Sequence, residues 1–283
     1  MEMSNKQLEI ALSPCPNDVF IISGLLLNKI PSFLNLSFHF EDIETLNQLA
    51  LNKKYPVIKA SFAIWKDISP FYELLPVGSA LGFGVGPLII SKNFYSVKDF
   101  PNLKIAIPGK HTTAHLLFNF FYSGNIKKIF VRYNQIIPMV LENKTDLGIL
   151  IHEGRFIYKN YGLKALVDLG KFWEEKTNAP LPLGGFFIKK ELKFEIKKEI
   201  VKLLRSSIEW AKNNWETVFP VLQKYAQELD ENTIKNHVDT YVNEYTFELK
   251  SPAIKGLKVL AEFLKMPYKL EEIIFLRFEY GVI

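Results

Sequence analysis

The chain has 283 residues, of which 48% are hydrophobic and 23% charged, a composition typical of a globular protein that can bury a sizeable core. Its formal net charge of +5 comes from scattered lysines without a basic run, which argues against a nucleic-acid partner. A single cysteine, Cys15, excludes an internal disulfide, and the absence of a secretory signal pattern or a membrane-length apolar run predicts a cytoplasmic protein with no membrane partner.

The first 61 residues alternate between strand and helix patterns. Leu8–Leu12 predicts a strand, and Asn17 and Asp18 are expected N-cap residues of a helix over the apolar run Val19–Leu27. The following elements are a strand at Leu34–Phe40, a short helix over Ile43–Ala50 and a strand at Pro56–Ser61. This order is typical of an α/β fold with a mainly parallel sheet.

A second unit of the same kind follows a glycine-rich segment at 74–92. Its expected elements are a strand at Lys104–Ile107, a helix from His111, a strand at Lys128–Val131, a helix at Ile136–Leu141, strands at Leu147–Ile151 and Ala165–Leu169, and a strand at Phe186–Lys189. Helical patterns follow at 195–229 and 234–242, and Ser251-Pro252 is a typical helix start. Two tandem α/β units predict two lobes with a cleft between them.

Four predicted strand ends carry small or polar residues. Three of them are 13–18, 59–61 and 108–113, and His152 follows the buried strand Leu147–Ile151. In open α/β sheets, ligands bind beyond the carboxyl ends of the strands. An imidazole at such an end suits a general base or acid, although a histidine satisfied inside the core is the other interpretation.

The helix start at Thr112 and Thr113 suits an anionic group, because the first N–H groups of a helix are free. The other interpretation is that Thr112 is only an N-cap residue. "PGKHTT" (108–113) lacks the glycine and the hydroxyl residue that a phosphate-binding loop needs around GK. "GFGVGP" (82–87) does not open a helix, so it indicates a hinge or close backbone packing rather than dinucleotide binding.

Metal and nucleophile chemistry have weak support in the sequence. His111 and His115 are four residues apart and are expected to share a helix face, but no HExxH pattern is present and the other histidines are dispersed. Cys15 has no histidine partner at a recognisable spacing. We therefore expect no metal site.

Six segments in order resemble the 1,4-dihydroxy-6-naphthoate synthase family of the futalosine route to menaquinone. They are SPCPNDVF (13–20), VIKASFA (57–63), LLPVGSALGFGVGPLIIS (74–91), KIAIPGKHTTA (104–114), DLGILIHEGRF (146–156) and PLPLGG (180–185). The resemblance implies a two-lobed α/β fold like type II periplasmic binding proteins, with an interlobe cleft and C-terminal helices that return to the first lobe. Lobe 1 would comprise 1–95 and 190–283, and lobe 2 would comprise 96–189.

The resemblance also implies an activity and a site. The enzyme would be a carbon–carbon lyase that converts cyclic dehypoxanthine futalosine, a small-molecule substrate, to 1,4-dihydroxy-6-naphthoate without a cofactor. His152 matches the family's general base, and Ser61 and Thr113 match its ligand contacts. We add three further candidate substrate-binding residues at the same strand ends, namely Asn17, Thr112 and Ile151. Val19 stands where the family usually has threonine.

Two other functions stay open at this point. One is chorismate dehydratase, an enzyme of the same pathway and fold, against which the SPCPNDVF and ILIHEG motifs argue. The other is a small-molecule binding protein of the same shape without catalysis. The sequence assigns no role to Glu153 or Arg155 and does not indicate the oligomeric state.

Overall fold

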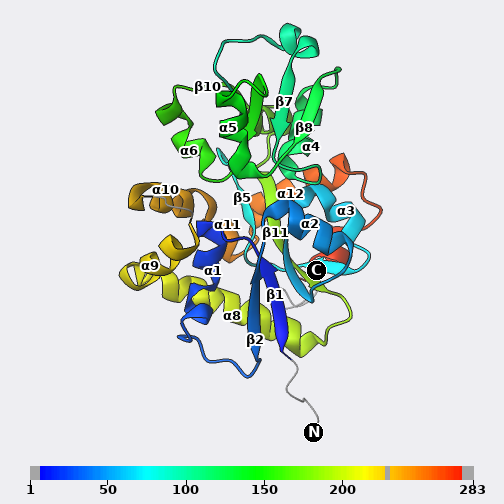
Figure 1. Cartoon of the computed structure of the whole chain (residues 1–283). Coiled ribbons are helices and arrows are strands. Elements are labelled where there is room, and N and C mark those ends of the chain that lie inside the picture. Colours follow the sequence, from blue (N-terminus) through cyan, green and yellow to red (C-terminus); the bar gives the residue numbers. More distant parts are fainter. Residues whose placement is uncertain (1–6, 227–229, 276–283) are drawn as a thin grey trace.

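The computed structural model describes residues 7–226 and 230–275, which build two β-sheets covered by helices (Figure 1). The first sheet has the order β2-β1-β3-β11-β4 with β5 paired to β11, and the second has the order β10-β6-β9-β7-β8. The strands are β1 (Leu8–Leu12), β2 (Leu36–Phe40), β3 (Val57–Ser61), β4 (Tyr72–Leu74), β5 (Ala80–Gly82), β6 (Leu88–Ser91), β7 (Lys104–Ile107), β8 (Lys127–Phe130), β9 (Leu147–Leu150), β10 (Lys164–Asp168) and β11 (Leu181–Lys189).

Helices lie between and outside these strands. The α-helices are α1 (Pro16–Leu26), α2 (Ile43–Leu51), α3 (Trp65–Ile68), α4 (Thr113–Phe121), α5 (Ile136–Leu141), α6 (Gly154–Ile157), α7 (Leu169–Thr177), α8 (Phe194–Lys212), α9 (Trp215–Tyr225), α10 (Glu231–Tyr241), α11 (Glu244–Phe247), α12 (Ser251–Phe263) and α13 (Leu270–Ile273). Short 3-10 turns lie at η1 (Phe62–Ile64), η2 (Val97–Asn102), η3 (Tyr133–Gln135) and η4 (Tyr158–Tyr161).

The expected strand–helix alternation is confirmed in the order β1-α1-β2-α2-β3. β1 is parallel to both β2 and β3, as predicted for such a unit. The sheet is nevertheless mixed, because β11 runs antiparallel to β3, β4 and β5. The prediction of a mainly parallel sheet therefore holds for the first three strands only.

Two strands lie in a different sheet from the one that the expected lobe boundaries imply. β6 falls in the range expected for lobe 1 but pairs with β9 and β10 in the second sheet. β11 falls in the range expected for lobe 2 but pairs with β3 in the first sheet. The chain therefore passes between the two sheets at 83–87 and again at 169–180, and we call these two segments the crossovers. The local sequence does not reveal them, because each strand is placed by an antiparallel partner that is distant in the chain.

Several helix starts differ from the predictions by a few residues. Cys15 is the N-cap of α1 and Pro16 is its first residue, so Asn17 and Asp18 lie inside the first turn and are not caps. Proline suits this place because it lacks the N–H that a first turn leaves unpaired. The N-cap of α12 is Lys250, one residue before the predicted Ser251. The helical pattern predicted at 195–229 is two helices, α8 and α9.

The end of the chain is described only up to residue 275, so the choice between a final helix and a final strand, which the sequence does not decide, lies partly outside the described residues. α13 precedes this point, and Ile274 forms an isolated parallel bridge with Leu74 of β4.

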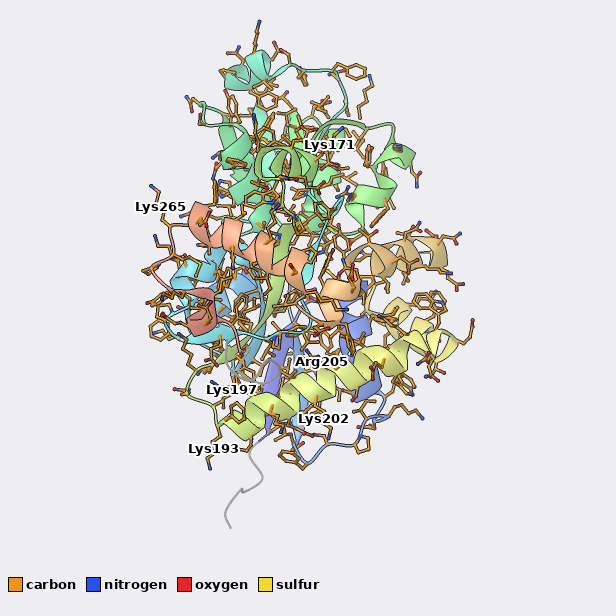
Figure 2. The ribbon with its side chains drawn as sticks, turned by 180° about the vertical axis from the view of Figure 1, so that it is seen from behind. Lys171, Lys193, Lys197, Lys202, Arg205 and Lys265 are labelled. Atoms are coloured by element: carbon orange, nitrogen blue, oxygen red, sulfur yellow. The ribbon has the colours of Figure 1, made fainter. Side chains whose placement is uncertain are left out.

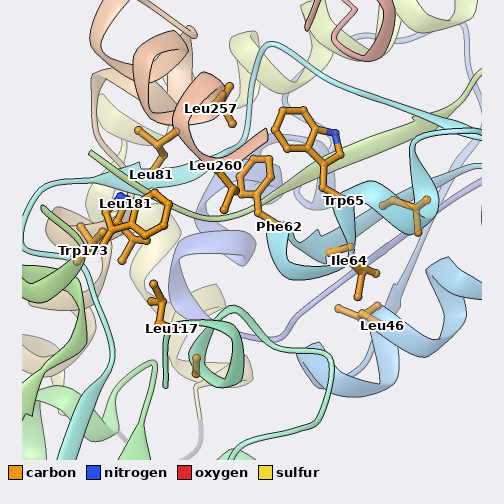
Figure 3. Packing of buried hydrophobic residues seen from close by; sticks show 14 of the residues in the cluster. Leu46, Phe62, Ile64, Trp65, Leu81, Leu117, Trp173, Leu181, Leu257 and Leu260 are labelled. Carbon is orange, nitrogen blue, oxygen red and sulfur yellow. The ribbon is translucent and has the colours of Figure 1, made fainter. Parts of the chain in front are cut away.

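The largest hydrophobic core runs across both sheets. It combines side chains of the first sheet and its helices, such as Phe62 and Trp65, with Leu117 and Trp173 from the second unit. Figure 3 shows these residues together with Leu260 of α12. A close-packed core at the junction thus joins the two sheets.

The C-terminal helices cover the first sheet, as the resemblance implied. α8 packs along α1, and its Leu203 and Ile208 share a buried cluster with Ile10 and Leu12 of β1. Within the described residues, no helix is long and apolar enough to cross a membrane.

The cations labelled in Figure 2 lie on different parts of the molecule, although four of them follow α8. Lys197 pairs with Glu73 at 2.6 Å, and Arg205 Nε donates to the Phe247 carbonyl oxygen at 3.2 Å. Much of the α8 charge is therefore engaged within the chain.

Candidate functional site

A pocket of about 640 Å³, counted to its open mouth, lies where the carboxyl ends of β1, β3, β7 and β9 meet. The lining residues come from both sheets and from α10: Ser13, Asn17, Asp18, Ile43, Lys59, Ser61, Ala80, Val85, Pro87, Thr112, Thr113, Ala114, Ile151, His152, Leu183, Gly184 and Tyr241. The pocket thus brings together all six candidate residues of the sequence, which are Asn17, Ser61, Thr112, Thr113, Ile151 and His152.

A buried ion pair forms one wall of the pocket. Lys59 Nζ lies 2.9 Å from Asp18 Oδ1 and donates to the Gly78 carbonyl oxygen at 2.7 Å. Asp18 also accepts hydrogen bonds from Ser13 Oγ at 2.7 Å and Asn17 Nδ2 at 2.8 Å. Buried charges need such partners, so this wall is rigid and its charges are balanced within the protein.

Ser61 is the last residue of β3, and Asn47 of α2 holds it in place by two hydrogen bonds. Its N–H donates to Asn47 Oδ1 at 2.8 Å, and Asn47 Nδ2 donates to Ser61 Oγ at 3.0 Å. The same Nδ2 donates to the His111 carbonyl oxygen, which joins the two sheets at this point. The Ser61 hydroxyl proton has no acceptor among the described residues and can be donated to a ligand.

The two threonines at the start of α4 already make structural hydrogen bonds. Thr112 is the N-cap residue: its Oγ1 accepts from His115 N at 3.3 Å and donates to the Gly109 carbonyl oxygen at 3.0 Å. Thr113 Oγ1 donates to the Leu183 carbonyl oxygen at 2.7 Å and accepts from Ala63 N at 3.3 Å. The N-cap interpretation of Thr112 is thus confirmed, and both residues still border the pocket.

His152 lies two residues after the end of β9 and has the left-handed backbone conformation, with φ of +53°. Its Nδ1 lies 3.3 Å from Cys15 Sγ, and its ring meets Tyr133 edge-on at 5.0 Å between centroids. The other ring nitrogen, Nε2, is buried and has no hydrogen-bond partner among the described residues. An unpaired nitrogen on a pocket wall is available to a ligand.

Burial keeps His152 uncharged. Burial lowers its pKa to about 4, and Lys59 adds to this effect, while the carboxylates of Asp18 and Asp42 oppose it. Burial also raises the pKa of the Cys15 thiol, together with the nearby Glu153 and Asp18. The thiol and the imidazole are therefore both neutral near pH 7, which excludes a thiolate–imidazolium pair.

Cys15 has a histidine neighbour, His152, that the sequence did not indicate. The two residues are 137 positions apart, so no local spacing could reveal the contact. His237 of α10 was also missed as part of the site: its ring lies parallel to that of His152, and its Nε2 contacts Asn17 Oδ1 at 2.9 Å. The SPCPN loop thus touches both histidines.

Arg155 and Glu153, which the sequence left unassigned, lie beside the site. Arg155 Nη1 donates to the Gly86 carbonyl oxygen, and Nη2 lies 3.4 Å from Asp168 Oδ2. Arg155 thereby links the segment after His152 to the crossover at 83–87 and to the last residue of β10. Burial raises the pKa of the Glu153 carboxyl.

The glycine-rich segment serves backbone packing, as one interpretation of the sequence predicted. A Cβ added to Gly86 would lie 2.1 Å from the Cα of Gly170, so the two crossovers touch through their backbones. Val85 and Pro87, on either side of Gly86, border the pocket.

Val19, where the family usually has threonine, is fully buried in a cluster with residues of α9 and α10 and does not border the pocket. A threonine hydroxyl at this point would need a partner outside the pocket.

The histidines at the start of α4 do not share a helix face, in contrast to the expectation. His111 precedes the helix and its Nδ1 lies 2.7 Å from Glu44 Oε1, whereas His115 Nδ1 donates to the Lys110 carbonyl oxygen at 2.8 Å. Among residues 7–226 and 230–275, no group of three or more His, Cys, Asp or Glu side chains is arranged to hold a metal ion.

A family model described as menaquinone biosynthesis matches residues 8–266. This chain belongs to that family. It is 38% identical over 242 residues to 1,4-dihydroxy-6-naphthoate synthase of Thermus thermophilus, covering 86% of this chain and 88% of that protein. It is 35% identical over 263 residues to the synthase of Streptomyces coelicolor, covering 90% and 93%. The resemblance drawn from the six segments is confirmed.

Solved structures share the fold of this chain. The protein AF1704 of Archaeoglobus fulgidus superposes with a TM-score of 0.86 at 32% identity, covering 93% of this chain and 99% of that one. The alkanesulfonate-binding protein SsuA of Xanthomonas axonopodis has a TM-score of 0.68 at 11% identity, with 94% of each chain covered. The second likeness shows the fold alone, and it confirms the predicted periplasmic-binding-protein-like architecture.

Proposed function

We propose that the chain is a 1,4-dihydroxy-6-naphthoate synthase that cleaves cyclic dehypoxanthine futalosine, with His152 as the general base. The observation that carries the proposal is the unpaired, buried Nε2 of a neutral His152 on the wall of the pocket. A neutral imidazole can accept a proton from a carbon acid, which would start cleavage of the carbon–carbon bond. The family and both named relatives support the activity.

The shape of the pocket supports this substrate. A flat bicyclic ring system needs apolar walls, which Ile43, Val85, Ile151 and Leu183 provide. Its carboxylate would lie at the start of α4, where Thr113 and Ala114 border the pocket and the first N–H groups of the helix are directed outward. The Ser61 hydroxyl would donate to the polar part of the substrate.

The remaining candidate residues, Asn17 and Thr112, would hold neighbouring parts of the pocket in place. Asn17 would hold Asp18 and His237 in place while facing the substrate, and Thr112 would fix the start of α4. Closure of two lobes around the substrate would exclude water from the reacting carbon. A cytoplasmic location, the lack of a cofactor and the lack of nucleic-acid binding stay predictions.

Incubation of the purified protein with the cyclic substrate, followed by mass spectrometry, tests the activity. We expect the naphthoate product from the wild type and a rate lowered by about 10²–10⁴-fold in His152→Asn. Asparagine is chosen because it tolerates the left-handed conformation of this position. His39→Asn, which changes a histidine outside the pocket, is the matched control and should keep the wild-type rate.

Three outcomes would contradict the proposal. A His152→Asn variant with near wild-type turnover would remove His152 from the role of base. Conversion of chorismate in place of the cyclic substrate would favour the dehydratase. Binding of the cyclic substrate without any product would favour a binding protein of the same fold.

A further inference from the structure

The thiol of Cys15 lies against Nδ1 of His152, and the other ring nitrogen, Nε2, is the one that would take the proton in the proposed function. Cys15 is 3% exposed at the N-cap of α1, and its backbone N–H donates to Ser13 Oγ at 3.3 Å. Its Sγ makes no capping bond to the helix and lies 3.3 Å from His152 Nδ1. The sulfur is therefore directed at the imidazole and not at the backbone.

The backbone conformation of His152 indicates that the surrounding residues hold its side chain in one orientation. A residue other than glycine with φ of +53° is strained, and such strain persists only where the surroundings determine it. The ring is fixed on three sides, by Cys15 at Nδ1, by the edge of Tyr133 and by the parallel ring of His237.

Two arrangements of the protons are compatible with the 3.3 Å contact. If the thiol donates to Nδ1, the imidazole proton is on Nε2, where it is buried without an acceptor. If Nδ1–H donates to the sulfur, the unpaired donor is the S–H group instead. A thiol is a much weaker donor than an imidazole N–H, so leaving it unpaired costs less free energy.

We propose that Cys15 is a positioning residue whose sulfur accepts the Nδ1–H of His152 and so keeps the lone pair of Nε2 directed into the pocket. This assignment rests on the proposed role of His152 as base. When Nε2 takes a proton from the substrate, Nδ1 becomes a charged donor, and its bond to sulfur strengthens at that moment. Because the thiol itself stays protonated, Cys15 is not a nucleophile in this role.

Nitrogen-15 NMR of histidine-labelled protein tests the tautomer without any substrate. The signals of His152 are identified by their loss in His152→Asn. In the wild type we expect Nδ1 to be protonated and Nε2 to be unprotonated. In Cys15→Ala the proton should move in part to Nε2, because no acceptor remains at Nδ1. Cys15→Ser keeps an acceptor and should keep the wild-type tautomer.

Steady-state kinetics on the same variants test the consequence. We expect Cys15→Ala to lower kcat by about tenfold with KM within about twofold, which is less than the whole contribution of a general base. Cys15→Ser should stay within about threefold of the wild-type kcat. Circular dichroism and thermal midpoints check that both variants are folded, and the serine variant keeps the test valid if the alanine variant unfolds.

The outcomes separate this inference from the proposed function. A wild-type His152 with its proton on Nε2, or a folded Cys15→Ala variant with unchanged kcat, would overturn the role of Cys15 while His152→Asn is still inactive. If the wild type shows the expected tautomer but does not convert the cyclic substrate, the proposed function fails and the hydrogen bond stands.

Discussion

The imidazole rings of His152 and His237 lie parallel, with 6.2 Å between their centroids and 10° between their planes. Asn17 Nδ2 donates to Asp18, so the Asn17 Oδ1 that contacts His237 Nε2 is an acceptor and His237 carries its proton on Nε2. Burial lowers the pKa of His237 well below its usual value, and the neighbouring His152 adds to this effect. Two neutral rings, of which His152 borders the pocket and His237 lies buried behind it, are therefore the form that the fold favours.

This pair makes the stability of the protein depend on pH. The pKa of His152 is about 4 in the folded protein and about 6.5 in an unfolded chain, so the unfolded chain binds more protons between these values. The free energy of unfolding should be highest above pH 6.5 and fall towards pH 4, with His152 accounting for on the order of 3 kcal/mol. Urea unfolding at pH 7.5, 6, 5 and 4.5 measures this loss.

His152→Asn is the control for that series, because the comparison cancels the other titrating groups. The variant should lose less stability on acidification than the wild type, and equal slopes would contradict the assignment. The acid limb of kcat/KM for the cyclic substrate should likewise lie near pH 4 to 5 and not near 6.5.

Ser61→Ala should weaken substrate binding more than it slows the chemical step. Removing a hydroxyl that donates to the ligand would raise KM by about fivefold, the value of one neutral hydrogen bond, with kcat less affected. Ser69→Ala is the matched control, because Ser69 is an equally buried serine that donates to the Lys66 carbonyl oxygen away from the pocket. An unchanged KM in Ser61→Ala would remove Ser61 from the binding site.

Lys59→Met should destabilise the protein by roughly 3–5 kcal/mol, because it leaves the Asp18 carboxylate buried without its cation. Lys144→Met, which breaks an exposed pair with Glu142, should change stability by less than about 1 kcal/mol. Chemical unfolding of both variants measures the difference. A cost for Lys59→Met as small as that for Lys144→Met would mean that the pair is not needed to balance the wall of the pocket.

Gly86→Ala should disturb both crossovers, because its Cβ would meet the backbone of Gly170, which cannot rotate away. We expect a loss of roughly 3 kcal/mol in stability and a raised KM, since Val85 and Pro87 border the pocket. Gly84→Ala meets no atom within 4 Å but has φ of +69°, so it should cost about 1 kcal/mol. Similar losses in the two variants would contradict the close packing of the crossovers.

Local patterns predicted most of the elements but not how two strands pair. The strand predicted at Phe186–Lys189 begins earlier, at Leu181, so that Gly184 and Gly185 lie inside β11. A Cβ at Gly184 would approach the Ala60 carbonyl oxygen to 2.8 Å, so the glycines permit close packing within the sheet. The expected boundaries put β6 in the first lobe, but β6 pairs with β9 in the second sheet. Local patterns do not show this pairing, because β9 lies more than fifty residues further along the chain.

The sequence by itself determined the α/β architecture, the family and the residues at the four strand ends, because periodicity and short motifs are local properties. Only the tertiary structure decided which groups meet there. The contacts of His152 with Cys15 and His237, and the pairing of Lys59 with Asp18, join residues that are 137, 85 and 41 positions apart. Burial of the two rings and the thiol, and not their spacing in the chain, sets their charge and leaves Nε2 of His152 without a partner among the described residues.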